Sequence, residues 1–382
     1  MEVVLCVTGS VAAVEAVKLA RELKRRGLSV KCFMSDGATE ILHPNAMEFA
    51  TGQEVVLSLT GKIEHVKYAQ ADLILVAPAT ANVISKLACR IADNPINTLL
   101  ITAFGYGTPI IFVPSMHHSM YKAISPNIEK LEERITFIKP KLEEKKAKFP
   151  DIEDIVLHVL RETSNDDLAG KKILISTGAT YEKLDEVRGI TNLSSGKTGV
   201  ELAKEAFIRG ADVTLICGHQ DVDVPQIFKV INVGSVGDMQ EAVLEQIPDH
   251  EIFISAAAVS DFIPQRNKGM TKISSSEDIV LKLERAPKII NQVKKINPEI
   301  FLVSFKAEYD ISEEELIKSA RKKMSEFDAD LIIANDVSKE GAGFGSDDNE
   351  VLIINNEEVL KVPLASKTEI AREILDKILE LI

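Results

Sequence analysis

Two short β-branched segments each run directly into a small, glycine-containing turn and then into a helical pattern. Residues 3–7 lead into the turn at 8–10, and residues 172–176 lead into the turn at 177–179. Such a turn places backbone N–H groups and a helix N-terminus where an anion can bind. Two such starts, a domain's length apart, predict two α/β domains in series that each bind a nucleotide or a phosphate.

The bulk composition fits two globular domains. The chain has 382 residues, of which 45% are apolar and 27% are charged, as in ordinary folded proteins. The net charge of −13 argues against nucleic-acid binding, because counterion release needs a basic face. No segment approaches the roughly 18 apolar residues of a membrane span, and Met1 leads straight into a predicted strand, so we expect no signal peptide.

The cysteines indicate a reducing compartment. None of them stands at the spacing of a metal site or of a CxxC motif, and most lie in or beside apolar runs: Cys6, Cys32, Cys89 and Cys217. We therefore expect buried free thiols and a cytoplasmic protein.

Alternating strand and helix patterns predict an α/β fold with two Rossmann-like, three-layer domains and mainly parallel sheets. The predicted strands are 3–8, 29–34, 72–77, 109–113, 172–176, 212–217, 251–255, 301–306 and 330–334. A helix is predicted at 11–26, a hairpin at 350–362 turning at Asn355-Asn356, and a closing helix at 367–382. Residues 141–150 look charged and mobile. We expect domains at 1–162 and 171–382, joined by a linker at 163–170.

Small polar residues follow three predicted strands of the first half. Gly9 and Ser10 follow the first strand, Ser35 the second, and Thr80 and Asn82 the third. Ligands of open parallel sheets bind outside the carboxyl ends of the strands. Any one of these residues alone reads as a turn or a helix cap, but their joint position at consecutive strand ends favours a binding site.

Two histidine segments are candidates for chemistry. His65 stands just before a predicted helix, where a histidine is usually a surface residue. His117 and His118 follow the strand at 109–113, but neighbouring side chains point apart and no acidic or thiol partner stands at ligand spacing. A metal site is therefore disfavoured, and no metal ligand is assigned.

A family pattern runs through the first half. It consists of Pro78-Ala79-Thr80-Ala81-Asn82, Lys86-Leu87-Ala88, Ile91-Ala92-Asp93-Asn94 and Pro114-x-Met116-x-x-x-Met120-Tyr121. With it, residues 1–138 resemble the flavin-binding cysteine decarboxylases. The resemblance implies an FMN bound between protomers of a trimer and an active-site base at His65. It also implies the FMN contacts Gly9, Ser10, Ser35, Thr80, Asn82 and Thr98.

Two positions depart from that family's pattern. His117 stands where the bacterial sequences have an asparagine that binds the substrate carboxylate, and an imidazole can also donate to a carboxylate. The family's substrate flap carries a cysteine that reprotonates the enethiol, whereas residues 138–152 contain none. Either another acid serves, or the activity of this domain is altered.

The second half contains a Gly-Lys-Thr sequence that is not a P-loop. The P-loop motif needs a glycine five residues before Gly196, and Thr191 stands there. The segment also lies well beyond the strand at 172–176 rather than directly after it. A capped helix start is the plain alternative.

An ordered set of motifs in the second half is far more specific. It consists of Gly178-Ala179-Thr180-x-Glu182, Asp185-x-Val187-Arg188, Asn192-x-Ser194-Ser195-Gly196-Lys197-x-Gly199, Ala256-Ala257-Ala258-Val259-Ser260-Asp261, Lys272-Ile273, Ala334-Asn335-Asp336 and Gly343-Phe344-Gly345-Ser346-Asp347-x-Asn349. Over residues 171–381 these motifs resemble the phosphopantothenate–cysteine ligases. In that family CTP activates the acid to an acyl-cytidylate, and the cysteine amine then displaces CMP.

The resemblance implies roles for individual residues. Asn192 corresponds to the residue that handles the acyl-cytidylate, and Lys272 to a phosphate-binding lysine needed for activation. The implied nucleotide contacts are Ala257, Ala258, Asp261, Lys272, Phe305 and Lys323. These residue types suit the chemistry, because attack of a carboxylate on a triphosphate needs lysines and Mg2+ to neutralise charge.

Together the resemblances predict a bifunctional enzyme of coenzyme A synthesis that acts on 4'-phosphopantothenate, cysteine and CTP. They imply a homo-oligomer built from flavodomain trimers and ligase dimers, up to a dodecamer. One alternative is a working ligase fused to a weakened or repurposed flavodomain. Another is a flavin-binding regulatory module without catalysis, although a pure binding module needs no base at His65.

Overall fold

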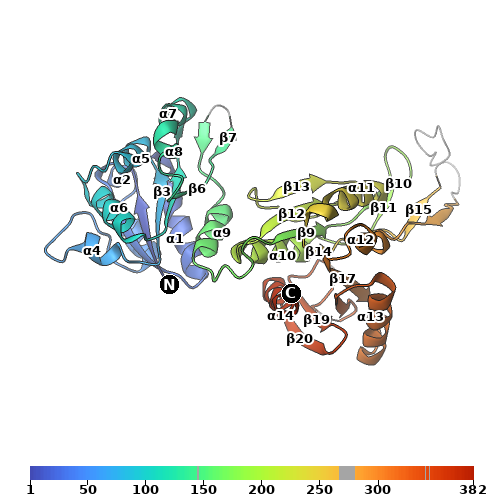
Figure 1. Ribbon diagram of the computed structural model, residues 1–382. Helices are drawn as coiled ribbons and strands as arrows, with labels where there is room; N and C mark the ends of the chain where they lie inside the picture. Colours follow the sequence, from blue (N-terminus) through green and yellow to red (C-terminus); the bar gives the residue numbers. More distant parts are fainter. Residues whose placement is uncertain (144–145, 266–279, 340, 344) are drawn as a thin grey trace. The chain divides into compact units, whose positions relative to one another are not determined.

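The computed structural model describes residues 1–143, 146–265, 280–339, 341–343 and 345–382. The chain divides into two compact units, Met1–Ser164 and Asn165–Ile382. Each unit has its own apolar core on both faces of its own main sheet, and Figure 1 shows the elements of each. Within the described residues, no helix has the length and apolar character needed to cross a membrane.

The first unit is built on a five-stranded sheet in the order β2-β1-β3-β4-β6, with all pairs parallel. Its strands are β1 (Glu2–Val7), β2 (Ser29–Met34), β3 (Leu73–Ala79), β4 (Ile110–Pro114) and β6 (Thr136–Phe137). Strands β1, β3 and β4 are buried almost throughout, which explains why they read as continuous apolar runs. The chain leaves β1 toward β2 on one side and later returns to β3 on the other, so β1 and β3 form the switch point.

Helices cover both faces of this sheet. One face carries α1 (Ala16–Arg25), α3 (Pro44–Thr51) and α9 (Ile152–Glu162). The other carries α4 (Glu64–Tyr68), α5 (Ala81–Ala88), α6 (Pro95–Tyr106) and α8 (Ser125–Glu129). The remaining elements of the unit are the 3-10 helix Val11–Glu15, α2 (Asp36–Thr39), α7 (His118–Ala123) and a small antiparallel sheet of β5 (Met116–His117), β8 (Lys146–Lys148) and β7 (Lys141–Glu143).

The second unit is built on an eight-stranded sheet in the order β13-β12-β9-β14-β17-β18-β19-β20. Its strands are β9 (Lys172–Thr177), β12 (Asp212–Cys217), β13 (Lys229–Asn232), β14 (Ile252–Ser255), β17 (Phe301–Glu308), β18 (Leu331–Asp336), β19 (Asp348–Ile354) and β20 (Val359–Ser366). The pairs are parallel except at β18–β19 and β19–β20. The switch point lies between β9 and β14.

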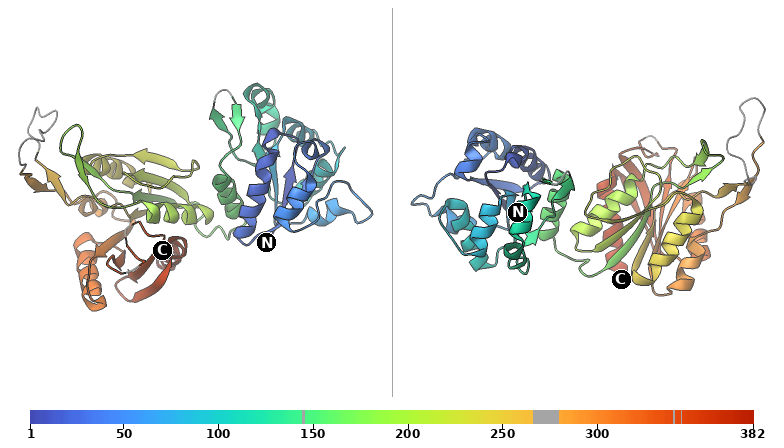
Figure 2. Two further views of the ribbon diagram at one scale, coloured as in Figure 1. Left: turned by 180° about the vertical axis from the view of Figure 1, so that it is seen from behind. Right: turned by 90° about the horizontal axis from the view of Figure 1, so that it is seen from above.

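Helices again cover both faces of the sheet (Figure 2). One face carries α10 (Lys197–Ile208) and α14 (Lys367–Leu381). The other carries α11 (Val236–Gln246), α12 (Ile290–Ile296) and α13 (Glu313–Phe327). The short strands β10 (Tyr181–Lys183), β11 (Gly189–Thr191), β15 (Phe262–Pro264) and β16 (Leu283–Arg285) form two hairpins, and the 3-10 helix Ile247–Asp249 follows α11.

The predicted α/β class with mainly parallel sheets is confirmed, and three local expectations change. The helix predicted over 11–26 is a 3-10 turn, Val11–Glu15, followed by α1. The charged segment 141–150 contains strands β7 and β8, because backbone pairing with β5 supplies order that its composition does not indicate. Of the four free cysteines, Cys89 is exposed rather than buried.

Candidate functional site

The carboxyl ends of β1, β3 and β4 are tied together by side-chain hydrogen bonds. The Thr8 hydroxyl donates to the carbonyl oxygen of Pro78 at 2.7 Å and accepts from the amide N–H of Thr80 at 3.1 Å. The Ser10 hydroxyl donates to the Ser115 hydroxyl at 3.2 Å. The predicted residues Ser10 and Thr80 therefore belong to one group, which we call the flavodomain strand-end group. Thr8 and Ser115 were not predicted, although each directly follows a strand.

Gly9 permits a close approach of two backbone segments at this group. A Cβ atom on Gly9 would lie 2.9 Å from the carbonyl carbon of Gly37 in α2, so only glycine fits there without a shift. Ser35 begins α2, and its hydroxyl accepts from the amide of Ala38 at 3.3 Å. The segments that follow β1 and β2 thus meet without side chains between them. Such bare backbone is the kind of surface that a flat ring or a phosphate binds.

The other predicted FMN contacts lie on α5 and α6. Thr80 begins α5, with its hydroxyl 3.5 Å from the amide nitrogen of Val83, and Asn82 is exposed in the first turn of that helix. Thr98 is half-buried on α6, where its hydroxyl donates to the carbonyl of Asn94 at 2.8 Å. Thr80 and Asn82 lie at the strand end, whereas no contact that the structure describes joins Thr98 to the group.

His65 lies inside α4 rather than before a helix as predicted. The helix is held by Tyr68, whose ring packs edge-on against Phe33 with the centroids 5.7 Å apart. Among the described residues, the Nδ1 atom of His65 is buried without a hydrogen-bond partner. Within one chain, the described contacts do not bring His65 to the flavodomain strand-end group.

The loop before His65 is closed by a carboxylate. Glu64 accepts hydrogen bonds from both the amide, at 2.9 Å, and the hydroxyl of Thr60. These bonds lower the pKa of the Glu64 carboxyl to about 2. The turn also contains Ile63 in a left-handed conformation, with φ of 46°. We call this arrangement the Thr60–Glu64 latch, and it fixes the first turn of α4, which carries His65.

His117 begins α7 and is exposed. Its Nδ1 atom lies 3.3 Å from the amide nitrogen of Ser119, which donates to it, and 2.8 Å from the Ser119 hydroxyl. An Nδ1 that accepts places the proton of a neutral imidazole on Nε2, which is then a donor. His117 also pairs in backbone register with Lys146 of β8. The segment that corresponds to the family's flap is thereby attached to the strand that carries His117.

In the second unit, the loops after β9 and β12 are in close backbone contact. Ala179 and His219 exchange two backbone hydrogen bonds of 2.7 Å each. A Cβ atom on Gly178, whose φ is +76°, would lie 2.6 Å from the carbonyl oxygen of His219, and one on Gly218 would lie 2.4 Å from the carbonyl oxygen of Ala179. The close contact between the two backbones therefore requires glycine at both positions.

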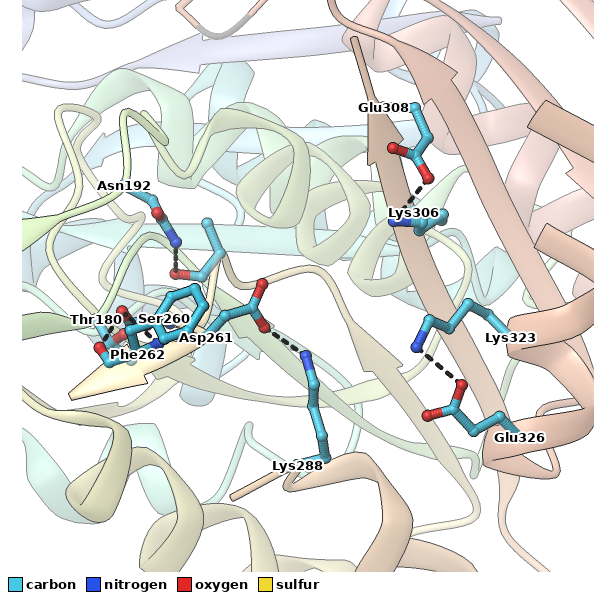
Figure 3. A network of polar contacts seen from close by, with 11 residues as sticks. Thr180, Asn192, Ser260, Asp261, Phe262, Lys288, Lys306, Glu308, Lys323 and Glu326 are labelled. Atoms are coloured by element: carbon cyan, nitrogen blue, oxygen red, sulfur yellow. Dashed lines mark hydrogen bonds and ion pairs between the residues drawn. The ribbon is translucent and has the colours of Figure 1, made fainter. Parts of the chain in front are cut away.

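The loop after β14 completes the switch point. The amide of Ala258 donates to the carbonyl of Gly178 at 2.8 Å, and the carboxamide nitrogen of Asn192 donates to the carbonyl of Ala258 at 3.1 Å (Figure 3). The amide of Ser260 donates to the Thr180 hydroxyl at 2.9 Å. The structure thus brings together Asn192, Ala257 and Ala258. Thr180 and Ser260 hold this ligase strand-end group in shape.

The Gly196–Lys197 segment begins α10 and does not form a P-loop after a strand. Gly196 has a φ of 76°, and its carbonyl accepts from the Thr177 hydroxyl at 2.7 Å. Lys197 forms an ion pair with Asp347. Two motifs that are far apart in the sequence therefore meet at the start of α10, where Gly199 packs directly against Thr177.

The remaining predicted nucleotide contacts lie around the ends of β14 and β17. Asp261 forms an ion pair with Lys288. Phe305 is partly buried on β17, and Lys323 projects from α13 with its Nζ 2.8 Å from a carboxylate oxygen of Glu326. Figure 3 shows the ammonium group of Lys288 meeting Asp261, and that of Lys323 pointing toward the side on which Asp261 lies. Lys272 lies outside the described residues.

No group of three or more His, Cys, Asp or Glu side chains suited to a metal ion occurs within the part of the chain that the structure describes. The two strand-end groups thus consist of backbone, hydroxyl, amide and alanine surfaces, with lysines beside the second. Such groups can bind anions and flat rings.

Comparison with known proteins agrees with both halves. The flavoprotein family model matches residues 1–164, and the model for the DNA/pantothenate metabolism flavoprotein C-terminal domain matches residues 168–382. The coenzyme A biosynthesis bifunctional protein CoaBC of Thermococcus kodakarensis is 47% identical over 388 residues, covering 99% of this chain and 94% of that protein. The protein of the same name from Methanocaldococcus jannaschii is 40% identical, covering 100% and 94%.

A solved structure is similar to part of the chain. The DNA/pantothenate metabolism flavoprotein from Streptococcus pneumoniae is 30% identical, with a TM-score of 0.50, and covers 56% of this chain and 100% of that chain. The chain therefore belongs to the family of bifunctional coenzyme A biosynthesis proteins, CoaBC, in which a flavoprotein domain precedes a DNA/pantothenate metabolism flavoprotein C-terminal domain.

Proposed function

We propose that the chain catalyses two successive steps of coenzyme A biosynthesis. The second unit joins cysteine to 4'-phosphopantothenate with CTP through an acyl-cytidylate, and the first unit decarboxylates that product to 4'-phosphopantetheine with FMN. The observation that carries the proposal is that each unit has its own strand-end group at its own switch point and matches its own family model. Two separate sites suit two reactions on one phosphorylated substrate.

In the proposed ligation, a substrate carboxylate oxygen attacks the α-phosphorus of CTP, and pyrophosphate leaves with the electron pair of the broken P–O bond. Asn192, held against Ala258, would donate to or accept from the acyl phosphate. Ala257 and Ala258 leave space for a ring beside the backbone. Lys323, Lys272 and Mg2+ would neutralise the phosphates, with the ion held mainly by the phosphate oxygens.

In the proposed decarboxylation, a bound FMN supplies the oxidation of the substrate thiol that makes loss of CO2 possible. The residues present fit the cofactor, because the backbone at Gly9 lies bare against Gly37 beside the hydroxyls of Ser10 and Thr80. His65, whose Nδ1 has no hydrogen-bond partner in the described part of the chain, would accept the thiol proton. The Nε2–H of His117 would donate to the substrate carboxylate in place of the family's asparagine.

The site of the first unit is proposed to form between protomers. The Nδ1 atom of His65 on α4 has no hydrogen-bond partner among the described residues of its own chain, and a neighbouring protomer would bring His65 to the strand-end group. We propose a flavodomain trimer and a ligase dimer, whose combination gives a dodecamer. A mass measurement on the intact chain in solution tests this.

The function is tested by supplying purified protein with 4'-phosphopantothenate, cysteine, CTP and Mg2+. We expect release of pyrophosphate followed by CO2, and a yellow protein with a flavin absorption spectrum. Pyrophosphate without CO2 would indicate a ligase with a repurposed flavodomain, as the cysteine-free segment 138–152 allows. Protein that takes up no FMN would refute the assignment of the first unit.

A further inference from the structure

Lys306 lies near the carboxyl end of a strand in the main sheet of the second unit. It lies in β17, where it is paired in register with Ala334 of β18. On its other side, β14 and β17 are paired up to Ser255 and Ser304, and β14 ends at Ser255, before it reaches the level of Lys306. Lys306 therefore has a small residue, Ala334, beside it on β18, and the strand on its other side ends before it reaches Lys306.

The ammonium group of Lys306 is held by one carboxylate. Its Nζ atom lies 2.9 Å from a carboxylate oxygen of Glu308, and the same oxygen accepts from the Ser319 hydroxyl at 2.9 Å. Lys306, Ser319 and the positive charge of Lys323 together lower the pKa of the Glu308 carboxyl. The Lys306 side chain is 27% exposed, so it is largely immobilised and yet reaches solvent at the strand end.

Lys306 and Lys323 face the proposed nucleotide site from β17 and α13. Figure 3 shows the ammonium groups of Lys306 and Lys323 pointing toward the side on which Asp261 and Asn192 lie. Lys323 is assigned to the nucleotide by family resemblance, whereas the strand register places Lys306 at the carboxyl end of β17, just beyond the end of β14. Each lysine is paired with a carboxylate of its own, Glu308 or Glu326.

We propose that Lys306 is a further phosphate-binding residue of the ligase site, that it stabilises the pyrophosphate leaving group, and that Glu308 is its positioning residue. The proposal rests on the proposed ligase function. Lys306 keeps its proton and forms no covalent bond during the reaction. As the bond from the α-phosphorus to the bridging oxygen breaks, negative charge grows on that oxygen, and a fixed ammonium group stabilises it more than it stabilises bound CTP.

The first test replaces Lys306 in the full-length chain by methionine, which keeps the length of the side chain and removes the charge. We expect kcat/KM for CTP, followed by pyrophosphate release, to fall on the order of a hundredfold, the usual effect of removing one such group. Calorimetric titration with Mg-CTP should show weaker binding. Lys306→Arg should recover most of the loss, because it keeps the charge.

A matched control separates this effect from general loss of surface charge. Lys361 lies in the same unit and is paired with Glu313 at 2.6 Å. Lys361→Met should leave CTP affinity and pyrophosphate release unchanged. Decarboxylation of supplied phosphopantothenoylcysteine by the same Lys306→Met protein should also remain, which reports that the chain has assembled.

The positioning role of Glu308 has its own signature. Glu308→Gln leaves the ammonium group unneutralised and poorly aligned, so we expect KM for CTP to stay level or fall while kcat falls about tenfold. A loss of structure in this part of the sheet would instead raise KM. An increase of KM as large as that of Lys306→Met would refute the positioning role.

The outcomes distinguish this inference from the function on which it rests. If the wild-type chain releases pyrophosphate with CTP and Lys306→Met matches it in kcat, KM and CTP affinity, the role of Lys306 is refuted and the ligase function stands. If Lys306→Met and Lys306→Arg lose activity equally, the charge is not the cause and the proposal also fails. If the wild-type chain releases no pyrophosphate, the ligase function itself is refuted.

Discussion

His65 and Asn192 allow the two proposed reactions to be separated by single substitutions. His65→Asn removes the proposed base and should abolish CO2 release from supplied phosphopantothenoylcysteine while leaving pyrophosphate release intact. Asn192→Asp places a negative charge where Asn192 now donates to Ala258, so it should reduce pyrophosphate release at least a hundredfold and spare decarboxylation. If either variant stopped both reactions, the division into two sites would be wrong.

The loop after β9 can contact the His219 carbonyl only because Gly178 has no side chain. Gly178→Ala combines a φ of +76° with a collision against the His219 carbonyl, so we expect a loss of unfolding free energy of about 1–3 kcal/mol or more. Gly170→Ala is the matched control, because its φ is +75° with nothing within 4 Å. Urea unfolding followed by circular dichroism suits a chain without tryptophan. Equal losses in the two variants would contradict the role of the collision.

The Thr60–Glu64 latch predicts a pH dependence in the loop before His65. The folded carboxyl has a pKa of about 2, below its usual value in an unfolded chain. The latch therefore stabilises the loop above about pH 4.5 and loses this effect as the pH falls toward 2. Amide exchange at Thr60 should be slower in wild type than in Glu64→Gln at pH 6, and the ratio should approach one near pH 2. A ratio independent of pH would contradict the latch.

At the scale of elements, α13 begins at a reciprocal cap. The Ser312 hydroxyl accepts from the amide of Glu315 at 3.3 Å, and the Glu315 carboxylate accepts from the Ser312 amide at 3.4 Å. Ser312→Ala should lower the unfolding free energy of the second unit by about 1 kcal/mol. Ser325→Ala, at an exposed position of the same helix, should have almost no effect. A similar loss in both would show that the cap is unimportant.

The long buried strands were predictable from sequence, whereas short pairings were not. Strands such as β2 and β12 coincide with the predicted segments at 29–34 and 212–217, since burial on both faces leaves a mostly apolar run, interrupted by Lys31 in β2 and Thr214 in β12. Strands β7 and β8 have charged sequences, and they form because β8 pairs with β5 and β7 pairs with β8. Periodicity within one segment carries no information about such a partner.

The same distinction applies to the sites. Gly9 and Thr80 follow strands, so the position of a strand end indicated them, whereas Ala258 was indicated by family resemblance. Lys306 lies inside a strand, and only the pairing with Ala334 and the end of β14 at Ser255 show that its strand neighbours are small or absent. The space around a side chain depends on residues far away in the sequence. The sequence therefore indicates site residues that follow a strand better than site residues that lie inside one.

At the scale of the molecule, the two units should fold and function separately. Each has its own two-sided core, and the contact boundary lies between Ser164 and Asn165. A fragment of residues 1–164 should bind FMN, and one of residues 168–382 should release pyrophosphate with near wild-type kcat. The proposed sizes are a trimer and a dimer by mass measurement. An unfolded or inactive fragment would contradict the independence of its core.

Carrying both units on a single polypeptide also has a consequence for metabolic supply. The two catalysts are made in equal numbers, and no change in expression can alter their ratio. If the proposed reactions hold, only the relative turnover rates of the two units determine how much phosphopantothenoylcysteine accumulates between them. Any adjustment of the flux must then come from substitutions or effectors that act on one unit. The ratio of the two turnover rates is therefore set by the sequences of the two units.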